Sequence, residues 1–252
     1  MSDFDRNFAA PRAGYADRAA AIDAGLRAHM IRVYNYMASA VALTGIVAWL
    51  TYNLAVTTNS AGALVYTPLG QTLFHGPLMW VLVLAPLGLV MFISFRIGHL
   101  QAGTALALFY GYAGLLGLSL AAIFIGYTAT SITRVFFISA AAFGGLSLWG
   151  YTTQRNLSAF GSFLIMGLIG VVIASLVNLF LASSMLQFVI SVVGVLVFAG
   201  LTAWDTQKIK EMYSAMDDGT VAGRKAVMGA LTLYLDFINL FLMLLRLFGD
   251  RR

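Results

Sequence analysis

Long runs of hydrophobic residues, separated by short polar segments, dominate this sequence. A helix that crosses the hydrocarbon core of a bilayer needs about 20 mainly apolar residues. Seven runs meet this requirement, and they predict membrane-spanning helices at approximately residues 31–54, 78–97, 103–126, 132–151, 157–181, 186–206 and 226–248. The pattern therefore predicts an all-α integral membrane protein with seven transmembrane helices.

The composition supports a membrane protein with a single domain. Of its residues, 60% are hydrophobic and 10% are charged, whereas a soluble domain has about a quarter charged residues. Residues 1–30 alternate acids, bases and alanines and lack the features of a signal peptide. We interpret them as a cytoplasmic N-terminal tail and lead-in, and residues 31–252 as one seven-helix membrane domain. The sequence has no cysteine, which excludes disulfides and thiolate metal sites.

The basic residues predict the orientation in the membrane. Most of them lie in loops that seven spans place on one side: Arg27, Arg32, Arg96, Arg155, Lys208, Lys210, Arg224 and Lys225. The positive-inside rule then puts the N-terminus in the cytoplasm and the C-terminus outside. This distribution accounts for the net charge of +5 without a nucleic-acid partner. The basic tail Arg251-Arg252 is on the unexpected side, so six spans with a re-entrant last segment remain an alternative.

One acidic residue, Asp236, lies in the middle of the last apolar run. A carboxylate at membrane depth costs several kcal/mol unless it is paired, hydrated or neutralised, so it indicates a functional site. It belongs to a polar stripe with spacings of three and four, which place these residues on one helix face: Gly229, Thr232, Asp236, Asn239, Met243 and Arg246. Because a polar face must look into protein or a wet cavity, the last helix should be central or line a pore.

A second acid, Asp205, ends the preceding apolar run. If the two carboxylates meet, they would share a proton and could bind a hard cation through oxygen ligands. At about 1.5 Å per residue, Asp236 lies roughly 12–16 Å inside Lys225, but Asp205 only a few ångströms inside Lys208. The pair therefore requires that the last helix begins in the cytoplasmic interface or is strongly tilted. The alternative is that each aspartate is held by a Lys, Arg or Tyr for packing alone.

Three arginines are candidates for neutralising such a pair. Arg96 ends the second predicted helix on the same side as Asp205. Its long side chain could equally reach lipid phosphates as a membrane anchor. Arg134 and Arg246 belong to the opposite side, where we expect anchors.

Two segments resemble the C-terminal hallmark of the Bax inhibitor-1 family, also called transmembrane Bax inhibitor motif proteins. They are LTAWDTQKIKEMY at residues 201–213 and GALTLYLDFINLFLMLLRLFG at residues 229–249. Residues 143–178 resemble the fourth and fifth helices of the family. The resemblance covers most of the chain after about residue 30. The chain departs from the family pattern at Asn156, where Asp is common, and at Trp204, where Tyr is frequent; both aspartates are kept.

The resemblance implies seven helices, with the last one central and wrapped by the other six. It also implies that Asp205 and Asp236 form a pH-sensitive di-aspartate pair that gates a calcium leak, with Arg96 as its partner in a closed state. Bacterial members are linked to control of membrane-anchored proteolysis and eukaryotic members to suppression of cell death. We expect a multi-pass protein of a bacterial inner membrane.

The predicted function is therefore a pH-sensitive calcium leak channel, in contact with the bilayer, calcium and protons. We expect no enzymatic activity and no cofactor; calcium would be transported or bound at Asp205 and Asp236. The alternative is a non-conducting regulator of a membrane-anchored protease or of cell death. Its surfaces would be the N-terminal tail and the basic loop at residues 208–225.

Two other classes are disfavoured. An intramembrane aspartyl protease also uses two membrane aspartates that share a proton. However, its glycine-x-glycine-aspartate motif is absent from Leu233-Tyr234-Leu235-Asp236. A retinal protein needs a lysine within its last helix for the Schiff base, and residues 226–248 contain none.

Overall fold

The computed structural model describes residues 10–60 and 63–252, with side chains from residue 22 onward. In this part of the chain, seven helical segments are long and apolar enough to cross a membrane, as predicted. The long helices are α1 (Ala10–Ala55), α3 (Leu78–Arg96), α4 (Ala102–Leu120), α6 (Ala129–Thr152), α7 (Ser158–Leu181), α8 (Ser184–Glu211) and α9 (Gly219–Phe248). The backbone of residues 10–30, expected to be a tail and lead-in, belongs to α1; residues 1–9 lie outside the described residues.

Short elements fill the loop between the first two spans. Strands β1 (Val56–Thr58) and β2 (Leu64–Tyr66) pair antiparallel, with Val56 opposite Tyr66. Helix α2 (Pro68–Phe74) follows; the Thr67 hydroxyl accepts a hydrogen bond from the Gly70 amide, and proline occupies the first helical position. The other short elements are the 3-10 helix η1 (Ile97–His99) and α5 (Ile123–Gly126). These elements cap the bundle, and none of them supplies a predicted site residue.

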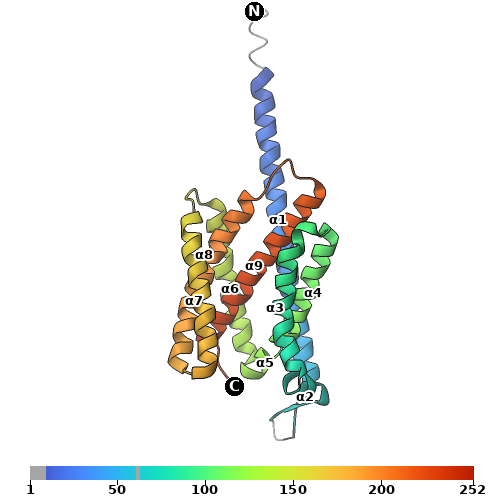
Figure 1. Ribbon diagram of the computed structural model, residues 1–252, viewed down its shortest axis with the longest axis vertical. Helices are drawn as coiled ribbons and strands as arrows, with labels where there is room; N and C mark the ends of the chain where they lie inside the picture. The colour runs from blue at the N-terminus through green and yellow to red at the C-terminus, as the bar shows by residue number, and fades with distance from the viewer. Residues whose placement is uncertain (1–9, 61–62) are drawn as a thin grey trace, which may run out of the picture.

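The last helix is the centre of the bundle. In Figure 1, α9 crosses the molecule diagonally, and it packs chiefly against α8, α1, α6 and α4. Within its most apolar stretch 72% of α9 is buried, against 11–39% for the other spans. Helices α3 and α7 pack on α4 and α8 instead. The prediction of a central C-terminal helix is therefore confirmed, although its main neighbours are four helices and not six.

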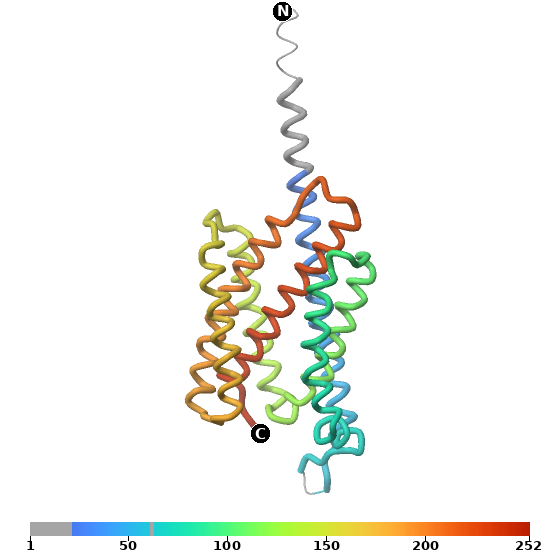
Figure 2. Tube along the Cα trace, viewed as in Figure 1, coloured from blue at the N-terminus to red at the C-terminus, as the bar shows by residue number. Residues whose placement is uncertain are grey.

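The tube in Figure 2 shows that α9 runs as one continuous helix between the two ends of the bundle. The C-terminus lies at the end opposite to the loop between α8 and α9 (Figure 1). This arrangement agrees with seven crossings and does not support a re-entrant last segment. Which end faces the cytoplasm stays a prediction from the charge distribution.

Candidate functional site

Asp205 of α8 and Asp236 of α9 lie together inside the bundle. Their residues are only 7% and 5% exposed. Both line the same cavity, which has a volume of about 280 Å³. The difference in depth expected from residue counting is removed because α9 begins well before Asp236 and crosses the bundle obliquely (Figure 1).

The cavity around the pair has mostly apolar walls. Ile165, Leu168, Phe198 and Leu201 are among its lining residues. One oxygen of Asp236, Oδ2, is buried without a hydrogen-bond partner in the described part of the chain. Two charged carboxylates in one cavity repel each other, and an unpaired buried charge is costly. A shared proton or a bound cation would relieve both costs, so the arrangement suits either ligand.

A cation and an aromatic ring flank Asp205. Lys208 follows Asp205 by one turn of α8 and forms no ion pair with it in the described part of the chain. Its ammonium group lies 5.0 Å from the centre of the Trp204 ring, in cation–π range. Trp204 lines the cavity, and its indole packs so closely on Gly161 of α7 that a Cβ there would overlap the ring. Glycine at 161 thus sets the position of this cavity wall.

A second and larger cavity continues from the first toward the C-terminal end. It has a volume of about 710 Å³ and shares Leu168, Phe198 and Asn239 with the first. Its polar lining residues are Ser175, Asn178, Gln187, Asn239 and Arg246. The predicted polar stripe of α9 therefore lines cavities from Thr232 to Arg246, as expected for an inward-facing polar face.

Toward the N-terminal end, side-chain hydrogen bonds tie α8 to its neighbours, and a separate cavity of about 580 Å³ between α1 and α6 does not include the aspartates. The Gln207 amide donates to the Arg155 carbonyl at 2.9 Å and accepts from the Leu157 amide at 2.8 Å, which ties α8 to the loop between α6 and α7. A hydroxyl pair between Ser147 and Thr206, 2.9 Å apart, joins α6 to α8. The cavity system thus extends mainly in one direction from the aspartates.

Comparison with known proteins identifies the family. The profile of the family described as "Inhibitor of apoptosis-promoting Bax1" matches residues 26–252. This chain belongs to the Bax inhibitor-1 family. The chain is 47% identical to the inner membrane protein YbhL of Escherichia coli over 232 residues, which cover 91% of this chain and 94% of YbhL. It is 48% identical to RP147 of Rickettsia prowazekii, over 91% of this chain and 92% of RP147. A Caulobacter vibrioides protein is 42% identical over the whole length of both chains.

Membership in the Bax inhibitor-1 family makes this a multi-pass membrane protein. Both departures from the family pattern have a structural role here. The Asn156 side chain accepts a hydrogen bond from the Ser158 amide at 2.8 Å, at the start of α7. Asparagine provides the same acceptor oxygen as aspartate. Trp204 fills the space above Gly161, as described for the cavity wall.

In this Bax inhibitor-1 family protein, Arg96 is not brought to the aspartates. It is exposed at the end of α3, a helix that packs against α4. The ion pairs of the described residues are Arg134–Asp250 and Lys225–Asp217. The gating role of Arg96 therefore stays a prediction. Arg134 lies at the C-terminal end, as expected for an anchor, whereas Arg246 lines the larger cavity.

Sequence reasoning did not connect Lys208 and Trp204 to the site. A usable signal was present, because residues three apart on a helix are surface neighbours. Asp205 and Lys208 have that spacing. The contact of Trp204 with Gly161 joins two different helices, so no local sequence pattern could have predicted it.

Proposed function

We propose that this protein is a pH-sensitive calcium leak channel whose ion site is the Asp205–Asp236 pair. The observation that supports the proposal is the burial of two adjacent carboxyl groups in one cavity, with one carboxylate oxygen lacking a partner in the described part of the chain. Carboxylate, amide and hydroxyl oxygens are the ligands that calcium prefers. We further propose an inner-membrane location, which is what the name of YbhL states for that relative.

The small number of acidic groups in the cavity favours weak, transient binding of calcium over tight binding. Within residues 10–60 and 63–252, no cluster of three or more His, Cys, Asp or Glu side chains gathers that could hold a metal ion. Calcium takes about 6–8 oxygen ligands. Asp205 and Asp236 supply carboxylates, and Thr232 and Asn239 add polar groups to the same cavity; water would complete the shell. Such a site binds weakly, as a leak pathway requires.

The larger cavity would be the route between the pair and the C-terminal end. Asn239 lies one turn beyond Asp236 and lines both cavities. Its amide nitrogen donates to the Leu235 carbonyl at 2.8 Å, so its side-chain oxygen is the group available to an ion. On the other side, the contacts of Gln207 and of the Ser147–Thr206 pair would have to open for an ion to pass. We assign the gate to this packed segment.

Protons would compete with calcium for the same oxygens. A protonated carboxyl group is a poor ligand, so metal affinity depends on pH. One proton shared by Asp205 and Asp236 would also remove their mutual repulsion and change which helix arrangement is stable. In an arrangement where α3 lies closer to α9, Arg96 would take the place of the proton or the cation.

Calcium flux into reconstituted liposomes tests the proposal. Asp236→Asn and Asp205→Asn keep the shape of the side chains but cannot titrate. We expect each to abolish the pH dependence of flux, whereas Asp23→Asn, which changes an exposed carboxylate of α1, should leave it intact. Unchanged flux and an unchanged pH profile in Asp236→Asn would refute the mechanism.

A second candidate function is a non-conducting regulator of a membrane-anchored protease or of cell death. The feature that favours it is the loop between α8 and α9, part of the predicted basic segment at residues 208–225, where Ala215, Met216 and Asp218 are exposed. An exposed loop offers a surface to a partner outside the bilayer. If removal of residues 1–21 abolishes a cellular effect while liposome flux persists, the regulatory role is favoured over conduction.

A further inference from the structure

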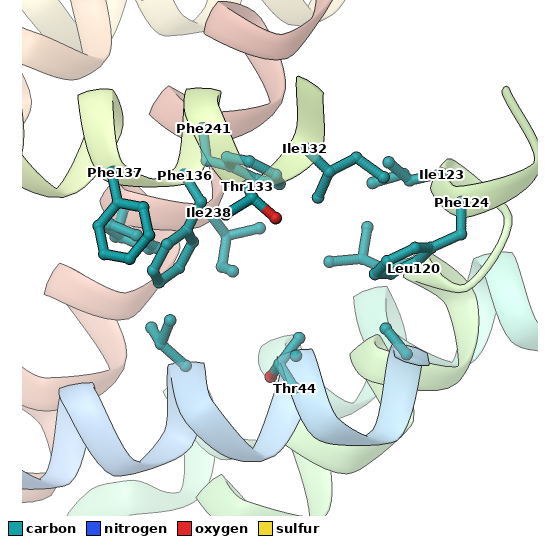
Figure 3. Close-up of a pocket in the computed structure, with 14 residues that line it drawn as sticks. Thr44, Leu120, Ile123, Phe124, Ile132, Thr133, Phe136, Phe137, Ile238 and Phe241 are labelled. Atoms are coloured by element: carbon teal, nitrogen blue, oxygen red, sulfur yellow. The ribbon is translucent and has the colours of Figure 1, made fainter. Parts of the chain in front are cut away.

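A separate apolar pocket lies between α1, α6, α9 and the segment around α5, on the side of α9 away from the two cavities. Its volume is about 320 Å³. Figure 3 shows an open space bordered by α1 below and by phenylalanines of α6 and α9 above. Thr44 and Gly45 of α1, Phe124, Phe136 and Phe241 are among the residues that line it. No aspartate of the proposed ion site belongs to this lining.

The pocket has almost no free hydrogen-bonding groups for a water molecule. The hydroxyls of its lining belong to Thr44 and Thr133, and both already have protein partners. Thr44 Oγ1 donates to the Ala113 carbonyl at 2.9 Å and lies 2.6 Å from the Tyr234 hydroxyl. Thr133 Oγ1 donates to the Ala129 carbonyl at 3.0 Å. Since a buried water needs 2–4 polar partners, the chemistry of this pocket selects an apolar occupant.

The pocket extends along α1. Its α1 residues run from Val41 to Ala48, which at 1.5 Å per residue is about 10 Å of helix axis. Thr133 and Phe137 on α6 are exposed, so the pocket opens sideways toward the region of the lipid. An alkyl chain lying parallel to the helices fits this shape.

Positive charge lies at the C-terminal end of the pocket. Tyr52 of α1 stacks on the pocket residue Phe124, with ring centres 5.5 Å apart. The Arg252 guanidinium donates to the Tyr52 hydroxyl at 2.9 Å. Arg252 is held there because its amide donates to the Gly126 carbonyl at 3.1 Å. A guanidinium has five N–H donors, so most of them remain available to a ligand.

The local charge balance is positive. Arg134 pairs with Asp250 at 2.9 Å, so among the side chains of this group Arg251 and Arg252 carry the excess positive charge. Both are exposed, and Arg251 is placed by a backbone bridge to Tyr127. Arginine is well suited to bind phosphate because its planar fork makes two parallel hydrogen bonds.

We propose that this pocket binds an anionic phospholipid. One acyl chain lies in the phenylalanine-lined pocket, and the phosphate lies on Arg252 and Arg251 at the C-terminal face. The lipid belongs to the leaflet on that side of the membrane. This site is independent of the aspartates, so it stands or falls separately from the proposed channel activity.

Native mass spectrometry of the purified full-length chain tests the site. The probes are phosphatidylglycerol and phosphatidylcholine with identical acyl chains, added at equal concentration. A Cβ at Gly45 would meet no atom within 4 Å, so Gly45→Leu has room for its first side-chain atom and places an apolar side chain at the pocket lining. Gly111→Leu is the matched control, because a Cβ at this exposed position on α4 also meets nothing and Gly111 does not line the pocket.

We expect the unmodified chain to retain phosphatidylglycerol over phosphatidylcholine. Gly45→Leu should lose this retention and Gly111→Leu should keep it. Arg251→Gln/Arg252→Gln should bind phosphatidylglycerol roughly tenfold more weakly, because the charge-assisted contacts with the phosphate are lost. If Gly45→Leu does not fold, Thr133→Trp blocks the same opening from α6.

Three results would overturn the proposal. They are equal retention of the two lipids by the unmodified chain, full retention by folded Gly45→Leu, and full retention by the arginine variant. A dimer that disappears in Gly45→Leu would assign the pocket to a second copy of the chain and would also overturn the lipid site.

Discussion

Trp204 of α8 lies directly against Gly161 of α7, with no space for a methyl group between the indole and the α7 backbone. This contact holds one wall of the cavity that contains the two aspartates. We expect Gly161→Ala to destabilise the protein by about 1–3 kcal/mol, the usual cost of overpacking. Thermal unfolding in detergent measures the effect. Gly170→Ala is the control in the same helix, because a Cβ there meets nothing; equal melting temperatures for both variants would contradict the packing described here.

The carboxylate pair predicts a defined sign for the pH dependence of cation binding. Because a ligating carboxylate must be deprotonated, calcium binding to the purified protein should strengthen as pH rises. Asp205→Asn and Asp236→Asn should each weaken binding and flatten its pH dependence, since one titrating ligand is lost. Isothermal titration calorimetry with calcium at several pH values measures both. If both variants bind calcium as strongly and with the same pH dependence as the unmodified chain, calcium does not bind at the Asp205–Asp236 pair.

A buried hydroxyl contact predicts an asymmetric mutational response. Thr44 Oγ1 and the Tyr234 hydroxyl are 2.6 Å apart. The Thr44 hydroxyl also has two alternative acceptors, the carbonyls of Ala40 and Ala113. Tyr234→Phe leaves Thr44 with partners and should cost about 0.5–1.5 kcal/mol. Thr44→Val leaves the Tyr234 hydroxyl without its partner and should cost more, about 1–3 kcal/mol. A double-mutant cycle by chemical unfolding tests this order, and a larger loss in Tyr234→Phe would contradict it.

Gln207 predicts a local change in dynamics. Its side chain accepts from the Leu157 amide and donates to the Arg155 carbonyl. Gln207→Ala should therefore increase hydrogen exchange in residues 153–158, because the Leu157 amide loses its acceptor. If the gate lies in this segment, basal calcium flux should rise as well. Gln101→Ala is the control, since that side chain makes no cap hydrogen bond at the start of α4; unchanged exchange in Gln207→Ala would show that the bridge does not restrain the loop.

The spans were predictable from the sequence because the length of an apolar run is a local property. The central position of α9 was also predictable, because the polar stripe through Asp236 must face the protein interior and not the lipid. The pairing of Asp205 with Asp236 could be predicted only on the condition that the last helix is tilted or begins in the interface. Helix tilt is set by packing between distant segments, so the sequence pattern does not reveal it. The same limit applies to Arg96, whose neighbours depend on where α3 lies. The hairpin of β1 and β2 was missed because its strands are only three residues long.

The burial of α9 has a consequence for biosynthesis. The core of this bundle is a helix, Gly219–Phe248, that the ribosome synthesises after all of its partner helices. Until that segment enters the membrane, α1, α4, α6 and α8 lack their common partner. Helices α1, α3 and α4 pack on one another without α9, and so do α6, α7 and α8. Insertion of α9 therefore joins two groups of helices that can already have formed, and the bundle is completed only at that step.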